Sequence, residues 1–501
     1  MSTATQELEA GRTTSRLSAA LQVTGWVSLA MLVASIVLLP LTAVQIVLAT
    51  VATVGLASDR RFGPLPAAVL VMLAAPYDRA ANILLPRLFD IPVRPQDAAL
   101  VVGLLLSVPR LRGASPRMLR SPLALTMMAF LAVGVIAMLV GLLGDNSLRD
   151  ILRDGRWWAL YAGGLLALLT RAGRPAVVRA IVVGTTIFAV LIIAVAALPA
   201  FEDALKWRAL EFDRGLLRMQ FGNSAMLLVT LAISVVGCVG RPRAWRVGWT
   251  TLLSVAIVLS LTRTFIVVAF GVLVLAIVAA LLDGRSRRRP VARPAAAGLP
   301  IAAMALGVVL AIGLSTFAAT VTAFTVSFTS QSTAASSGGP EEDPLDRLLL
   351  QSPVSDLGTL GGGRFETYRR AVDVITSAPL LGQGLGALVV AEYTFGGEEF
   401  DTPGKLPNVD DAWLTVGMKS GIVGIVTFAL MYLLAVMTAL RGPRWPRVWL
   451  IPAWLGILAL MTTQSFATTG YGPFVLGLLA VVPLLANGYT DSRVERARAH
   501  E

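Results

Sequence analysis

The stretch VGWTTLLSVAIVLSLTRTFIVVAFGVLVLAIVAALL, residues 247–282, contains one charged residue, Arg263, in 36 positions. A helix needs about 20 apolar residues to cross a hydrocarbon core about 30 Å thick. The stretch is too long for one span, so it predicts two membrane-spanning helices joined by a turn near Thr262–Arg263. Other apolar runs along the chain are Trp26–Leu39, Leu123–Leu143, Val177–Leu198, Ala225–Val239, Ile301–Phe317, Ile422–Leu440 and Phe474–Leu485.

The composition of the whole chain supports the same interpretation. Of the 501 residues, 56% are hydrophobic and only 14% are charged, whereas about 25% of the residues in a soluble domain are charged. We therefore predict an all-α fold, a polytopic transmembrane helical bundle of about 12–14 spans.

The positive charge of the chain is distributed by position. A formal net charge of +12 could suggest nucleic-acid binding, but the arginines gather in alternate connections between the apolar runs, which is the positive-inside pattern. The clusters are Arg60–Arg61, Arg110–Arg120, Arg171–Arg179, Arg241–Arg246, Arg285–Arg293, Arg441–Arg447 and the tail from Arg493. Anionic lipid of the inner leaflet explains them without nucleic acid. We expect a bacterial cytoplasmic-membrane protein with both termini in the cytoplasm.

This topology divides the chain into five parts. They are a cytoplasmic tail (1–20), transmembrane helices (21–324), a large extracytoplasmic loop (325–412), C-terminal transmembrane helices (413–488) and a cytoplasmic tail (489–501). The first tail is polar, so the first span is predicted to be a retained anchor rather than a cleaved signal peptide. Shorter outer connections are predicted at 77–96, 144–156, 199–221, 262–263 and 465–472.

The large loop has two different halves. Serines, glycines and the acidic run Glu341–Asp343 give its first half the composition of a disordered segment. The second half contains apolar residues at helical spacing between Arg364 and Ser377, which predicts an amphipathic helix. These apolar residues are Phe365, Tyr368, Val372 and Ile375. Pro379 ends the helix, and a tight, mobile turn is predicted at Gly382, Gly384 and Gly386.

Several arginines are predicted to lie at the outer face. Arg263 lies at the membrane boundary, where a cation must pair, reach water or bind a ligand. The other outer arginines are Arg153, Arg156, Arg218, Arg364 and Arg369. Because a guanidinium binds phosphate oxygens in a bidentate manner, a group of them would form a pyrophosphate site. The alternative is that each pairs with a nearby acid, such as Asp154, Asp213, Glu366 or Asp373.

The sequence PNVDDAWL contains the two candidate catalytic acids, Asp410 and Asp411. Either acid can cap the helix that follows or act as a general base toward a sugar hydroxyl; one can cap while the other acts. Lys419 lies two to three turns into that helix. A charge at this depth is a candidate functional residue, or it pairs with an acid on another helix.

Other chemistries find no support in the sequence. Cys238 is the only cysteine and His500, in the predicted cytoplasmic tail, is the only histidine. Neither a disulfide nor outer-face histidine chemistry is therefore expected. Gly361–Gly363 lacks the Lys-Ser/Thr of a phosphate-binding loop. We expect no metal, no cofactor and no nucleotide-sugar donor.

Residues 215–440 resemble the O-antigen ligase and polysaccharide polymerase family of membrane proteins. Four motifs carry the resemblance in the order of the family. They are Arg218-Met-Gln-Phe-Gly-Asn223, Thr262-Arg263-Thr264, Gly363-Arg364 with Pro379-Leu-Leu-Gly382-Gln-Gly384, and Asp410-Asp411-Ala-Trp413-Leu414 with Gly421-Ile-Val-Gly424. Asp410 stands where ligases of the family have histidine, which is more similar to the polymerase branch. Asp411 replaces an asparagine, and Lys419 replaces an acid.

The resemblance implies a GT-C-like helical fold and an inverting, metal-independent glycosyltransferase. Asp410, with Asp411 beside it, would take the proton of the acceptor hydroxyl, and the donor would be a glycan on undecaprenyl pyrophosphate. Arg263, Arg218, Arg364 and Arg156 would bind the donor pyrophosphate, with Lys419, Glu366 and Arg369 as supporting residues. The acceptor would be a glycan or glycolipid at the outer face of the membrane.

Two other functions fit a helical membrane protein. A secondary transporter or lipid-linked oligosaccharide flippase would place its polar residues near the bilayer midplane, whereas here they gather at the predicted outer boundary. A non-catalytic assembly scaffold is the third alternative. Fold similarity alone does not decide between them.

The predicted topology can be tested at Arg263. In a Cys238→Ser background, the Arg263→Cys variant is expected to react with a membrane-impermeant maleimide added outside intact cells, because the 262–263 turn is predicted to be extracytoplasmic. Labelling that requires permeabilised cells would contradict this topology.

Overall fold

The computed structural model describes most of the chain, and the statements below concern only those residues. The described residues are 3–38, 42–75, 87–88, 91–113, 119–170, 172–197, 210–213, 216–219, 224–236, 243–259, 263–285, 300–311, 357–391, 394–395, 398–399, 404–406, 408–409, 411–468 and 470–485.

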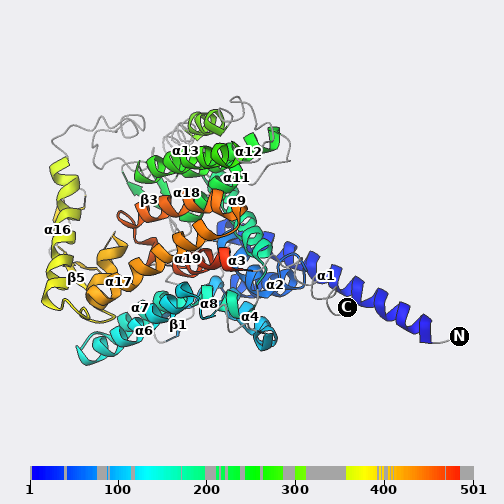
Figure 1. The fold of residues 1–501 in the computed structure, drawn as a ribbon, viewed down its shortest axis with the longest axis horizontal. Helices are drawn as coiled ribbons and strands as arrows, with labels where there is room; N and C mark the ends of the chain where they lie inside the picture. The colour runs from blue at the N-terminus through cyan, green and yellow to red at the C-terminus, as the bar shows by residue number, and fades with distance from the viewer. Residues whose placement is uncertain are drawn as a thin grey trace, which may run out of the picture.

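Helices dominate the architecture (Figure 1). In the N-terminal half they are α1 (Thr3–Leu38), α2 (Thr42–Ala57), α3 (Pro64–Ala74), α4 (Pro95–Ser107) with the 3-10 turn η2 (Val108–Gly113), α6 (Pro122–Leu143), α7 (Leu148–Leu160), α8 (Gly163–Leu169) and α9 (Arg174–Ala197). In the C-terminal half they are α11 (Ala225–Val236), α12 (Arg243–Leu259), α13 (Arg263–Arg285), Pro300–Ala311, α16 (Leu357–Ser377), α17 (Ala412–Arg441), α18 (Arg444–Met461), η6 (Ser465–Ala467), α19 (Gly472–Val481) and η7 (Val482–Leu484).

The strands of the described residues are short and form four antiparallel pairs. These are β1 (Arg87–Leu88) with β2 (Ile91–Pro92), β3 (Leu210–Asp213) with β4 (Leu216–Met219), β5 (Val389–Ala391) with β8 (Gly404–Leu406), and β6 (Thr394–Phe395) with β7 (Glu398–Glu399). In the longest pair, Glu211 lies opposite Arg218. All four pairs lie in connections between helices, so the predicted helical bundle is confirmed.

Five of the described helices are long and apolar enough to cross a membrane. The qualifying segments are Leu17–Ser35, Pro122–Leu143, Arg174–Ala194, Thr264–Leu282 and Ala412–Arg441, and eight further apolar helices are shorter. α12 ends at Leu259 and α13 begins at Arg263, so the described part of residues 247–282 forms two helices, as predicted. The chain is a multi-pass membrane protein; the number of spans stays a prediction.

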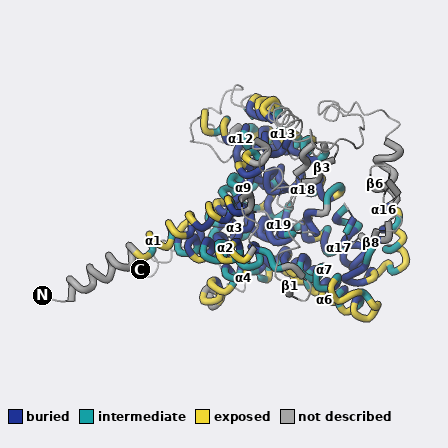
Figure 2. The backbone as a smooth tube through the Cα atoms, turned by 180° about the vertical axis from the view of Figure 1, so that it is seen from behind, coloured by how far each residue is buried: buried dark blue, intermediate teal, exposed yellow. Residues whose placement is uncertain are grey.

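Burial separates two kinds of helix (Figure 2). α3 and α19 are buried along their whole length. α3 packs against α2, α4 and α9, and α19 packs against α7, α8 and α17. A helix that is apolar all round must be enclosed. By contrast, α6, α13 and α17 expose apolar side chains such as Val135, Val267 and Val426. Because large exposed apolar surfaces are rare in soluble monomers, these faces indicate contact with lipid.

Connections predicted to be extracytoplasmic meet one another. The Asn146 side-chain amide donates hydrogen bonds to the carbonyls of Gln383 and Leu385 at 3.0 and 2.9 Å. The Arg156 guanidinium contacts both Asp97 and Tyr471. Four connections that are far apart in the sequence therefore share one end of the bundle.

Connections predicted to be cytoplasmic form a second group. The Arg179 side chain donates to the carbonyl of Arg61 at 3.1 Å. The Arg174 guanidinium donates to three carbonyls at the end of the last helix. These carbonyls belong to Val482, Pro483 and Leu485, at 3.0, 3.0 and 2.6 Å. The two groups agree with the alternation of arginine clusters in the sequence.

The predicted amphipathic helix exists. α16 starts at Leu357, before the predicted start at Arg364. Its buried centre is Ala371, whereas Val372, one of the four apolar residues of the predicted stripe, is 45% exposed. The small Ala371 side chain lets α16 pack against Val389, Val409 and Met418, and Val372 lies about 100° further round the helix.

α17 is interrupted at Gly421, which has φ 62° and ψ −158°. The turn after α16 fills the break with its backbone. The Ile422 and Val423 amides donate to the carbonyls of Pro379 and Leu380 at 2.8 and 3.3 Å. The Gln383 amide donates to the freed carbonyl of Met418 at 2.9 Å. Three of the backbone groups at the break are thus paired with the turn, as a low-dielectric interior favours.

The turn is as tight as predicted, and it is packed into the protein. Gly382, Gly384 and Gly386 have φ of 67°, 83° and 86°, in the region that glycine favours. A Cβ at Gly384 would lie 2.2 Å from the amide nitrogen of Gly141 in α6. The three glycines are buried, so the turn packs into the protein, and its predicted mobility stays a prediction.

Gly421→Ala is expected to lower the free energy of unfolding by about 3 kcal/mol or more. An added Cβ would meet the carbonyl of Leu380 at 2.4 Å in a backbone conformation that L-residues rarely adopt. The control is Gly271→Ala, where a Cβ meets nothing within 4 Å and helix propensity predicts a gain of up to about 1 kcal/mol. Unfolding midpoints in detergent measure the stability of both variants. Equal midpoints for Gly421→Ala and Gly271→Ala would contradict the prediction.

Candidate active site

A short amphipathic helix, α7, lies within the connection predicted at 144–156. Ser147 caps its start by accepting a hydrogen bond from the Asp150 amide at 3.2 Å. The helix then presents Asp150, Arg153 and Asp154 at spacings of three and four residues, which places them on one face. Its other charged residue of interest, Arg156, faces a different set of helices.

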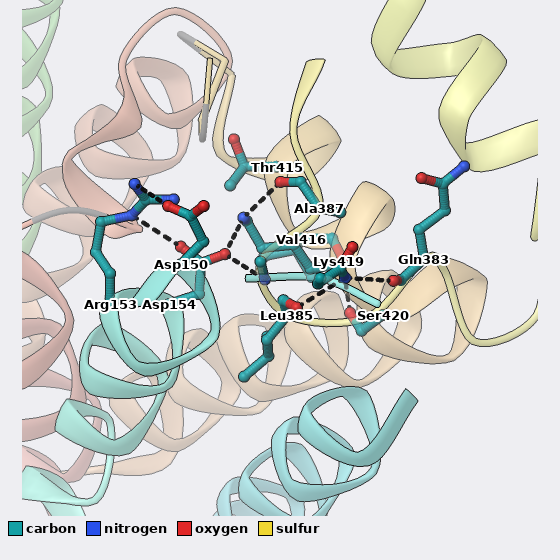
Figure 3. A network of polar contacts seen from close by, with 12 residues as sticks. Asp150, Arg153, Asp154, Gln383, Leu385, Ala387, Thr415, Val416, Lys419 and Ser420 are labelled. Carbon is teal, nitrogen blue, oxygen red and sulfur yellow. Dashed lines mark hydrogen bonds and ion pairs between the residues drawn. The ribbon is translucent and has the colours of Figure 1, made fainter. Parts of the chain in front are cut away.

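Asp154 is the buried centre of the first polar network (Figure 3). Its side chain is 0% exposed, as is that of Lys419. The Lys419 ammonium pairs with Asp154 Oδ2, and the same oxygen accepts the Gly386 amide at 2.8 Å. Lys419 Nζ also donates to the carbonyl of Ala387 at 3.3 Å. The alternative in which Lys419 pairs with an acid on another helix is therefore confirmed.

Arg153 and Asp150 extend this network toward the surface. Arg153 Nη1 lies 2.7 Å from Asp150 Oδ1, and Arg153 Nε lies 3.5 Å from Asp154 Oδ1. The side chain of Arg153 is 39% exposed, and that of Asp150 is 18% exposed. Two carboxylates and two cations make the group neutral overall, which is how a protein tolerates buried charge.

Arg156 joins three helices at the second polar network. Its Nη2 lies 2.5 Å from Asp97 Oδ1 in α4 and 2.6 Å from the Tyr471 hydroxyl at the start of α19. The Tyr471 hydroxyl donates to the same Asp97 oxygen, and the guanidinium lies 5.4 Å from the centre of the Tyr471 ring. Arg156 thus has an acidic partner, although Asp97 is not one of the acids proposed from the sequence.

The start of α17 is held from both sides of Asp410. Asp411 caps the helix by accepting the Leu414 amide at 2.9 Å. The buried Thr415 hydroxyl bonds both the amide and the carbonyl of Val409 at 3.2 Å. Burial raises the pKa of Asp411, and the amides of Leu414 and Trp413 partly oppose this shift.

Residues 249–429 match the family model described as O-antigen ligase. This range of the chain is similar to the O-antigen ligase family. The match covers a little over a third of the 501 residues, and no curated protein matches the chain. At the family level, the domain supports a ligase-type or polymerase-type enzyme that uses a lipid-linked glycan donor and an acceptor in the membrane.

The O-antigen ligase domain contains most of the predicted site, and the structure places part of it. Arg263 is the first residue of α13, and Arg364 and Glu366 lie in the first half of α16, but their side chains lie outside the described residues. Arg369 is exposed on α16. Asp410 lies outside the described residues, so its role stays a prediction.

Arg218 and its motif precede the matched range. The residue lies in β4, a strand that contacts α12, and its side chain is outside the described residues. The described side chains therefore do not test whether Arg218, Arg263 and Arg364 converge.

Sequence reasoning did not identify the central role of Asp154, nor Asp97 and Tyr471. Asp154 was considered only as a partner for a neighbouring arginine. A stronger signal was present: the buried Lys419 requires an acid, and α7 carries two acids in a predicted outer connection. Within the described residues, no group of three or more His, Cys, Asp or Glu side chains could hold a metal ion.

Asp411→Ala is expected to lower the free energy of unfolding by about 1 kcal/mol, because the N-cap bond to Leu414 is lost. Asp411→Asn keeps an equivalent cap. Because the native pKa of Asp411 is raised, the native state holds the proton more tightly, and the associated stability declines as the pH rises through the native pKa. The Asn variant does not titrate.

The stability of Asp411→Asn relative to the wild type should therefore increase as the pH rises from the ordinary aspartate pKa through the raised native pKa of Asp411. Denaturant unfolding in detergent at several pH values measures the difference. A parallel pH dependence of wild type and Asn variant would contradict the assignment.

Proposed function

We propose that the protein is an inverting, metal-independent membrane glycosyltransferase. It transfers a glycan from undecaprenyl pyrophosphate to a sugar hydroxyl at the outer face of the cytoplasmic membrane, in polymerisation or ligation of a cell-surface polysaccharide. The observation that carries this proposal is the O-antigen ligase match over residues 249–429, which contains Arg263, Arg364 and Asp410.

In the proposed reaction, Asp410 acts as the general base and Asp411 as the helix cap. The base accepts the proton of the acceptor hydroxyl, and the oxygen attacks the anomeric carbon of the donor glycan. The bond from that carbon to the pyrophosphate oxygen breaks, so undecaprenyl pyrophosphate leaves and the configuration inverts. General base catalysis of this kind contributes about 10²–10⁴-fold to the rate.

Arginines take the part that a metal plays in other transferases. We assign Arg263, Arg218 and Arg364 to the departing pyrophosphate, whose negative charge grows in the transition state. Arg156 is already engaged with Asp97 and Tyr471, so we assign it a supporting position between α4, α7 and α19. Arg369 and Glu366 support the same surface of α16.

The proposed side of the membrane rests on charge and on packing. The connections that carry the arginine clusters are assigned to the cytoplasm. The other connections meet around α7 and the glycine turn, and we place that end of the bundle outside. A lipid-linked donor needs no soluble energy source there, because its glycosidic bond is already activated.

A transporter shares one feature with this protein, a broken membrane helix. In transporters, the backbone groups released by the break bind the substrate or ion. In α17 the groups released by the break at Gly421 bond instead to Pro379, Leu380 and Gln383. This pairing favours an enzyme in which the break anchors a loop.

Asp410→Asn and Arg263→Ala are each expected to lower glycan transfer at least 100-fold in proteoliposomes with lipid-linked donor, because they remove the base and a pyrophosphate contact. Asp373→Asn, at an exposed acid on α16, is the control and should retain activity. All variants should purify as folded protein. Normal transfer by both Asp410→Asn and Arg263→Ala would refute the site assignment.

A further inference from the structure

One buried carboxylate oxygen connects three separate segments of the chain. Asp154 Oδ2, on α7, accepts the Lys419 ammonium of α17 and the Gly386 amide of the glycine turn. Lys419 closes the arrangement by donating to the carbonyl of Ala387, next to Gly386. Figure 3 shows Asp154, Lys419 and Ala387 close together between α7, α17 and the turn.

The pair bridges two different parts of the protein. Lys419 and Gly386 lie inside the O-antigen ligase match, whereas Asp154 lies more than 90 residues before it. The contact is therefore one through which the unmatched N-terminal half is attached to the matched domain. The two side chains are 0% exposed, so the attachment is formed away from water.

The segments held by the pair lead directly to the proposed site. α16, which carries Arg364 and Arg369, ends at Ser377, and the turn follows it at once. Ala371 of α16 packs against Val409 and Met418, which flank the capped start of α17. α16, the turn and the start of α17 thus form one packed unit, and the Lys419 pair fastens that unit to α7.

Other contacts fix the turn along α6 but do not replace this one. The Leu385 amide donates to the carbonyl of Ala137 at 2.8 Å, and Asn146 holds the carbonyls of Gln383 and Leu385. At residues 386–387, where the chain leaves the turn toward β5, the hydrogen bonds to other described segments are those with Asp154 and Lys419, beside the bond of the Ala387 amide to Gly384 within the turn. The pair therefore controls the direction in which the chain departs.

We propose that Asp154 and Lys419 are positioning residues that fix the α16–turn–α17 unit against α7 and so set where the proposed site, which that unit carries, lies relative to the N-terminal half. The effect on catalysis rests on the proposed glycosyltransferase function. The effect on geometry does not. The ion pair acts through the turn and touches neither donor nor acceptor.

The decisive variant removes both charges together. A single Asp154→Asn or Lys419→Met change leaves one buried charge without its partner, which by itself destabilises a protein. The double variant Asp154→Asn/Lys419→Met leaves no such charge and keeps an acceptor for the Gly386 amide. It loses the ion pair and the Lys419 bond to Ala387. We expect its unfolding midpoint to be close to that of the wild type.

Geometry is measured first, without any activity. In a Cys238→Ser background, spin labels at Arg149→Cys and Asp373→Cys, both exposed, report the distance between α7 and α16 in the full chain by pulsed electron resonance. The double variant should broaden the distance distribution at least twofold. The control is Ser234→Ala, which removes a buried hydroxyl pair with Thr250 (3.1 Å) between α11 and α12 and should leave the distribution unchanged.

Transfer kinetics in proteoliposomes then test the catalytic part. The double variant should lower kcat at least tenfold and leave KM for the lipid-linked donor within twofold, because the reacting groups are misplaced while the donor still binds. An unchanged distance distribution overturns the proposal, whatever the rate. A broadened distribution with wild-type kcat overturns the catalytic link. If the wild type itself transfers no glycan, the proposed function fails, and the distance measurement still decides the geometric claim.

Discussion

The buried ion pair between Asp154 and Lys419 constrains the rest of the extracytoplasmic end. A buried carboxylate and a buried ammonium are tolerated where each meets the other and further hydrogen bonds or charges support them. Here Gly386 and Ala387 each add one hydrogen bond. The second oxygen of Asp154 has the Arg153 guanidinium 3.5 Å away, and Asp150 balances the charge of Arg153 toward the surface. The glycine turn must therefore lie where α7 and α17 meet.

The glycine turn and the break in α17 depend on each other. A helix interrupted at Gly421 inside an apolar bundle would leave its carbonyl and amide groups unpaired, at a cost of several kcal/mol each. The backbone of the turn pairs them, and it can approach so closely because glycine stands at positions 141, 384 and 421. The helix is thus interrupted at Gly421, and the turn that packs into the interruption holds α16 beside the start of α17.

The two polar networks place the N-terminal half at the proposed site. α7 lies before the matched range, yet it supplies Asp154 to the first network and Arg156 to the second. Through Arg156 the helix reaches α4 and α19, and through Asp154 it reaches the O-antigen ligase domain. The reaction chemistry is assigned to the domain, and the scaffold that orients it is shared by the whole chain.

Much of the fold followed from the sequence alone, because hydropathy acts locally: the length of an apolar run predicts a span, and Arg263 within residues 247–282 indicated the break between α12 and α13. The alternation of arginines likewise predicted which connections meet, and Asp411 before an apolar run predicted a cap. Tertiary structure alone decided the partner of Lys419, the burial of Ala371 and the enclosure of the turn. The reason is that each depends on packing between segments that are tens to hundreds of residues apart, such as Asp154 and Lys419, whose separation in the chain carries no information about their distance in the fold.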